Sequence, residues 1–89
     1  MKETDIEIEQ LRKKLDSIDD SLSSLLSERV NIALRIIEIK KEKGMAVEDL
    51  NREEQIIQRV SQKNPSVAPL LKAVFRRIFD WVKSRHQPL

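Results

Sequence analysis

Several residue types on which common protein classes depend are scarce in this 89-residue chain. It has no cysteine, which excludes a disulfide framework and a thiolate metal site, and one histidine, which excludes a multi-histidine metal cluster. With one glycine and three prolines, the chain has few of the residues that form the turns between strands of a β-sheet. Tyrosine is absent and aromatic residues total 3%, so stacking platforms for single-stranded nucleic acid are missing. The composition therefore favours helices, and no metal or cofactor is expected.

Long apolar runs are missing as well, because no stretch approaches the roughly 20 apolar residues of a membrane span. The first residues lead into charged side chains without a signal-peptide core, so a cytoplasmic protein is expected. Charged residues make up 36% of the chain, yet the formal net charge is only +2. This balance argues against the one-signed basic face of a nucleic-acid binder. We expect a single domain over residues 1–89, with neither membrane nor nucleic acid as a partner.

The first half of the chain has the apolar periodicity of one long helix. Leucine and isoleucine recur at spacings of four and three, at Leu11, Leu15, Ile18, Leu22 and Leu25, and the same rhythm continues through Arg29 to Ile32, Ile36 and Ile39. With Thr4 as N-cap and Gly44 as C-terminal stop, a helix over residues 5–42 is predicted. It would be about 55 Å long, whereas a compact domain of this size has a radius of gyration of about 12 Å. A second copy of the chain is the economical way to cover it.

Two shorter helices are predicted after a connector at residues 45–48. Asp49 has the character of an N-cap for the second helix, which ends near Pro65. Ser66 would cap a third helix. Its apolar positions at helical spacing are Leu70, Leu71, Val74, Phe75, Ile78, Phe79 and Val82. The predicted fold class is all-α, with one long helix and two shorter ones in each chain.

Arg29 interrupts the leucine and isoleucine series of the first helix. Burying a guanidinium is costly unless an anion or a hydrogen-bonding partner meets it. Taken alone, Arg29 is explained by an ion pair with a partner helix, or by a polar residue that fixes helix register. Lys40 lies within about 20° of the same face and roughly 16 Å along the axis, although alone it would be a solvated lysine at a helix end. Together the two cations would suit a small dianion.

Arg12 lies 17 residues before Arg29, so about 25 Å away along one helix. It would serve the same pocket only from the other chain of an antiparallel dimer. Without that dimer, Arg12 is an ordinary surface arginine.

Four segments resemble the AroQ-type chorismate mutases in order and spacing, over nearly the whole chain. They are residues 11–19 (LRKKLDSID), 25–29 (LLSER), 39–40 (IK) and 47–53 (VEDLNRE). Each segment alone is a weak signal, but four in register are specific. The resemblance implies an intertwined homodimer of three-helix chains with sites shared between chains. It also implies an isomerase that converts chorismate to prephenate by a concerted shift, without a cofactor.

The resemblance implies roles for the three cations of the first helix. Arg29 and the partner's Arg12 would hold the substrate carboxylates, and Lys40 would donate to the ether oxygen and a carboxylate. Arginine suits a carboxylate through its bidentate fork, and lysine suits a single oxygen.

Three residues at the start of the second helix also receive roles from the resemblance. Arg52 would line the pocket near a carboxylate, Glu53 would accept the ring hydroxyl, and Asp49 would position the loop. From the residues alone, an ordinary N-cap for Asp49 and solvated first-turn charges for Arg52 and Glu53 would be preferred.

The third helix departs from the family pattern. Where the family has a glutamine that donates to the ether oxygen this chain has His86, and Val82 stands at the position of a serine. Gln87 is one residue late, and Lys83 replaces a usual apolar wall residue. We hypothesise that His86 replaces the glutamine and donates best when protonated. The alternative is a surface histidine, with Gln87 or water in that role.

Three other functions remain open from the sequence. An isochorismate pyruvate-lyase shares the fold and most of the cations; residues 49–53 favour the mutase, whereas Trp81 is faintly similar to the lyase. A purely structural helical dimer would need only the leucine and isoleucine series. A nucleic-acid-binding helix pair is disfavoured by the near-neutral charge.

Overall fold

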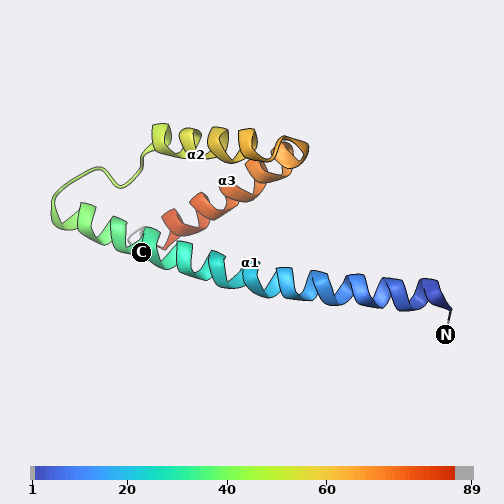
Figure 1. The fold of residues 1–89 in the computed structure, drawn as a ribbon. Helices are drawn as coiled ribbons and strands as arrows, with labels where there is room; N and C mark the ends of the chain where they lie inside the picture. Colours follow the sequence, from blue (N-terminus) through green and yellow to red (C-terminus); the bar gives the residue numbers. More distant parts are fainter. Residues whose placement is uncertain (1, 86–89) are drawn as a thin grey trace. The chain divides into compact units, whose positions relative to one another are not determined.

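The computed structural model describes residues 2–85. It contains helix α1 (Glu3–Glu42), helix α2 (Leu50–Lys63), a 3-10 turn η1 (Pro65–Val67) and helix α3 (Ala68–Ser84), as Figure 1 shows. No strand occurs within this described range. The prediction of an all-α chain with one long and two shorter helices is therefore confirmed.

Helix α1 begins earlier than predicted. The backbone amides of Asp5 and Ile6 both donate to the Lys2 carbonyl, at 3.0 and 3.2 Å, and the helix starts at Glu3. The prediction of Thr4 as N-cap is wrong, because Thr4 already lies inside the first turn. Glu3 and Asp5 place carboxylates at the positive end of the helix dipole, which favours a start at this point.

The predicted stop at Gly44 is confirmed. The Met45 amide donates to the Lys40 carbonyl at 2.8 Å, and the Gly44 amide donates to the Lys41 carbonyl at 3.2 Å. This is the pair of bonds of a Schellman motif. Gly44 has φ = 67°, a left-handed conformation that side chains with a Cβ rarely adopt. The glycine thus turns the chain out of α1 and into the connector.

The two shorter helices begin in different ways. Asp49 caps α2 as predicted, because its Oδ1 accepts a hydrogen bond from the Arg52 amide at 3.0 Å. The prediction for Ser66 is wrong, since it lies inside η1 and α3 starts at Ala68 without a side-chain cap. Prolines in the first positions of η1 and of α3 restrict the backbone there to helical φ values, so a hydroxyl cap is not needed.

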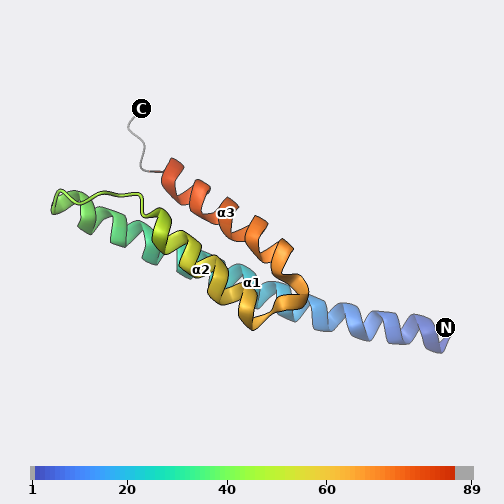
Figure 2. The same ribbon diagram turned by 90° about the horizontal axis from the view of Figure 1, so that it is seen from above.

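A cluster of buried apolar side chains lies between α2 and α3. Ile56, Ile57 and Phe79 are buried together, with Phe75 packed against them. The rings of Phe75 and Phe79 are 6.0 Å apart and inclined by 53°, a favourable aromatic arrangement. After η1, helix α3 returns alongside α2 (Figure 2). The start of α2 and the end of α3 are thereby parts of one helical hairpin.

The chain divides into two compact units, residues 1–31 and residues 32–89. In the first unit, every described residue before Arg29 is exposed. The apolar series is included, with Leu15 58%, Ile18 59%, Leu22 63% and Leu25 63% exposed. None of the helices in the described range is both long and apolar enough to cross a membrane.

Candidate active site

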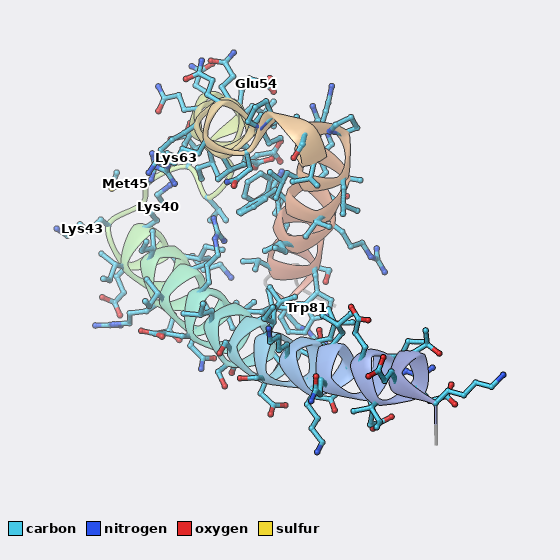
Figure 3. The ribbon with its side chains drawn as sticks, turned by 45° about the vertical axis from the view of Figure 1, so that its right-hand side comes forward. Lys40, Lys43, Met45, Glu54, Lys63 and Trp81 are labelled. Carbon is cyan, nitrogen blue, oxygen red and sulfur yellow. The ribbon has the colours of Figure 1, made fainter. Side chains whose placement is uncertain are left out.

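Burial separates Arg29 and Lys40 from the other charged residues of α1. Both are half-buried, whereas every other charged side chain of this helix is exposed. Figure 3 labels Lys40 on the last turns of α1 and Lys43 just beyond the helix. The two cations that the sequence placed on one face are therefore also the two charged residues of α1 that are partly shielded from water. Their partial burial distinguishes these two cations from the solvated charges of the same helix.

Helix geometry places Arg29 and Lys40 at the boundary between two faces of α1. At about 100° per residue, Arg29 and Lys40 lie within about 20° of one another around the α1 axis. On one side of them are the half-buried or buried positions Val30, Ala33, Leu34 and Ile37. On the other side is an apolar stripe exposed in the single chain, Leu25, Ile32 and Ile36. The cations thus lie between a sheltered face and an apolar face that this chain leaves open.

Arg12 is exposed and forms a 3.8 Å ion pair with Glu9 one turn earlier. The Arg12 and Glu9 side chains are 68% and 60% exposed, so the pair contributes little to stability. On the continuous helix α1, Arg12 and Arg29 are about 25 Å apart. A single chain does not bring Arg12 to the other two cations.

The start of α2 supplies the remaining predicted residues that the structure describes. Asp49 is exposed and acts as the N-cap, and Arg52 is exposed one turn further on. Glu53 differs, because its side chain is only 19% exposed. It precedes the buried Ile56 by three residues, which places it at the edge of the apolar face of α2.

Lys83 is the partner of Glu53 and was not predicted to have this role. Its ammonium lies 2.7 Å from Glu53 Oε2 and 3.8 Å from Glu48 Oε1. The hydrogen bond to Glu53 raises the pKa of Lys83, the carboxylates of Glu53, Glu48 and Asp80 act in the same direction, and partial burial opposes them. Lys83 is therefore an ammonium at neutral pH. The departure from an apolar wall residue is explained by this ion pair between α3 and α2.

A sequence signal for this pair did exist. Lys83 follows the buried Phe79 by four residues, and Glu53 precedes the buried Ile56 by three. Each charge therefore belongs to the edge of an apolar helix face rather than to the solvated side. Opposite charges at two such edges indicate a sheltered ion pair, provided that the two helices pack with these ends together.

A second ion pair also joins α2 to α3, but it is exposed. Arg76 lies 3.6 Å from Glu54, and both side chains are 53% exposed. Figure 3 labels Glu54 on α2 and Trp81 on α3. Near the end of α3, the Arg85 guanidinium stacks over Trp81 at 4.1 Å from the ring centroid. These contacts lie outside the predicted set of site residues.

The structure describes only some of the residues that were discussed as site residues at the end of α3. Val82, which stands where the family pattern has a serine, is buried. His86 and Gln87 lie outside the described residues. Among residues 2–85, no group of three or more histidine, cysteine or carboxylate side chains is arranged to hold a metal ion.

Comparison with known proteins identifies the family. The family model described as chorismate mutase type II matches residues 11–87. A bifunctional chorismate mutase/prephenate dehydratase of Aquifex aeolicus is 36% identical over 61 residues, which cover 68% of this chain and 17% of that protein. A chorismate mutase of Methanocaldococcus jannaschii is 37% identical over 51 residues, which cover 57% of this chain and 52% of that protein.

The matched part of the chain spans about half or less of the length of these curated relatives. No solved structure matches the chain. Both relatives and the family model carry the mutase name. Because the match extends over residues 11–87 of 89, the chain belongs to the chorismate mutase type II family.

Proposed function

We propose that this chain is a chorismate mutase, an isomerase that rearranges the dianion chorismate to prephenate. The observation that carries the proposal is the position of Arg29 and Lys40, half-buried on one stripe of α1 while the other charges of that helix are exposed. A small dicarboxylate would suit two cations on one helix face, because arginine and lysine both donate charge-assisted hydrogen bonds to carboxylates. Membership of the family supports this choice of dianion.

The reaction requires the protein to position the substrate and to place charged donors near it, but it requires no nucleophile. The rearrangement is concerted and breaks one ether bond, so no covalent intermediate with the protein is required. The protein must hold the flexible dianion in its compact reactive conformer. It must also place a fixed donor where negative charge develops on the ether oxygen. Arg29 would hold a carboxylate through its fork, and Lys40 would donate to the ether oxygen.

The start of α2 would complete the contacts with the ring. Glu53, sheltered beside α3, would accept a hydrogen bond from the ring hydroxyl. Arg52 would lie near a carboxylate, and Asp49 would hold the first turn of α2 through its cap to the Arg52 amide. None of these roles requires a metal or a cofactor.

A homodimer is part of the proposal. The N-terminal half of α1 exposes Leu15, Ile18, Leu22 and Leu25 in the single chain, an apolar stripe that monomers rarely leave in water. Packing this stripe against a second copy would bury it and would bring the partner's Arg12 within reach of the pocket. Each of two sites would then draw on both chains. The cytoplasmic location expected from the sequence stays a prediction.

One assay tests the proposed function. Purified protein is incubated with chorismate, and loss of the chorismate absorbance is followed together with the appearance of prephenate. We expect turnover without added metal, in the presence of a chelator. A parallel incubation with isochorismate that releases salicylate and pyruvate, with chorismate unchanged, would instead support the lyase. Inertness toward both substrates would contradict the proposal.

The proposal also includes His86 as a donor to the ether oxygen, and this has a consequence for pH. If the protonated imidazole is the better donor, kcat should fall several-fold as the pH rises from 5 to 8. The measurement is kcat between pH 5 and 8 for wild type and His86→Gln. His86→Gln restores the family's usual donor, so its profile should be flat. A flat wild-type profile, or full activity in His86→Ala, would refute this role.

A further inference from the structure

Lys83 is a sheltered cation to which the proposed reaction gives no role. Its side chain is 25% exposed and that of its partner Glu53 is 19% exposed. By contrast, the ion pair between Arg76 and Glu54 joins the same two helices with both side chains 53% exposed. Sheltered charges are screened less by water and salt, so the contact between Lys83 and Glu53 is the stronger of the two.

The charges at the start of α2 explain what a cation contributes there. Residues 48–53 contain three carboxylates, of Glu48, Asp49 and Glu53, and Arg52 is the only cation among them. This excess of negative charge would repel a dicarboxylate substrate. Lys83 brings a second cation from α3 and lies within 4 Å of two of the three carboxylates. It thereby reduces the repulsion without removing the hydrogen-bond acceptor.

The geometry also leaves Glu53 able to accept. An ionised carboxylate has two oxygens with about four lone-pair sites. Lys83 lies against Oε2, which leaves Oε1 for a hydroxyl group. A glutamate held in this way has lost much of its rotamer freedom before any ligand arrives, so less entropy is lost on binding.

We propose that Lys83 is a positioning residue that holds the Glu53 carboxylate against α3, so that Glu53 selects substrates carrying the ring hydroxyl. The inference rests on the proposed function and extends it to a residue outside the resemblance. The hydroxyl takes no part in the bonds that break and form. Glu53 therefore binds it about equally in the ground state and the transition state, and loss of Lys83 raises KM more than it lowers kcat.

The test compares Lys83→Met with wild type on two substrates, chorismate and an analogue that lacks the ring hydroxyl. With chorismate, we expect KM to rise about tenfold and kcat to change less than about threefold. A change of this size is expected because one charge-assisted contact that orients Glu53 is lost. The analogue carries the same carboxylates but gives Glu53 no hydroxyl to accept. With the analogue, Lys83→Met should therefore lose only the part of kcat/KM that comes from charge repulsion, a clearly smaller loss than with chorismate. Lys83→Arg, which keeps the ion pair, should retain most of the selectivity.

The matched control is Arg76→Met, which removes the other ion pair between α2 and α3. Its KM for chorismate should equal that of wild type, which separates positioning of Glu53 from general weakening of the hairpin. Should Lys83→Met fail to fold by circular dichroism, Lys83→Gln is compared in the same way.

The outcomes separate the two proposals. A wild-type chain without turnover would overturn the proposed function and the role of Lys83 with it. If the wild type is active, either of two results would overturn the role of Lys83 alone. One is an unchanged KM in the variant, and the other is an equal loss on both substrates.

Discussion

Arg29→Ala is expected to lower kcat/KM for chorismate by about a thousandfold, or about 4 kcal/mol of transition-state stabilisation. The loss corresponds to about two charge-assisted hydrogen bonds from a bidentate guanidinium to a carboxylate. Both the bound substrate and its transition state carry that carboxylate, so KM and kcat should both change. Steady-state kinetics on the purified variant gives the two parameters separately.

The same variant distinguishes an enzyme from a structural helical dimer. If Arg29 served only packing, its replacement by alanine would change stability or association and would leave the turnover of the folded protein unchanged. Sedimentation and urea unfolding should show a retained oligomer and little loss of stability, together with the loss of turnover. The control is Arg35→Ala, an exposed arginine of α1 paired with Glu38 at 3.1 Å, which should keep full activity. Full activity in Arg29→Ala would contradict its role.

Lys40→Met should lower kcat by about 100- to 1000-fold, with a smaller change in KM. Negative charge grows on the ether oxygen only as the bond breaks, so a donor at that oxygen stabilises the transition state more than the bound substrate. Methionine keeps most of the length and apolar character of the lysine stem, and it leaves the backbone carbonyl of residue 40 free to accept from Met45. Loss of folding is therefore a small part of the expected effect.

The control for Lys40 is Lys43→Met, the same substitution at an exposed position beyond the end of α1. It should have the kinetics of wild type. A variant Lys40→Met that lost affinity without losing kcat would contradict a role at the ether oxygen and would leave only a role in binding a carboxylate.

The sequence predicted well those features that depend on neighbours along the chain. Apolar periodicity indicated the long helix and the two shorter ones, and the stops and starts at Gly44 and Asp49 follow from local backbone chemistry. Thr4 does not cap α1, because acidic residues in the first turn favour an earlier start of that helix. Ser66 does not cap α3, because prolines set the backbone conformation at η1 and at the start of α3. Capping residues compete with such features, so helix starts were less certain than helix faces.

The sheltered ion pair between Lys83 and Glu53 was the main feature of the site that the sequence did not predict. The two residues are 30 positions apart, and their contact depends on how far α3 returns along α2. Periodicity assigns each of them to the edge of an apolar face, but it does not fix the register between two helices. The same limit applies to the proposed contribution of Arg12 from a second copy, which would depend on how two chains pack.

We propose that each active site takes Arg29 and Lys40 from one chain and Arg12 from the other. Arg12→Ala and Arg29→Ala chains are unfolded together in urea, refolded as an equal mixture and assayed with chorismate. In a mixed dimer one site carries both substitutions and the other carries neither. Half of the dimers are mixed, so about a quarter of wild-type activity should return, although each variant alone is nearly inactive. If chain exchange is shown by mass spectrometry and activity stays at the level of the separate variants, the sites are not shared.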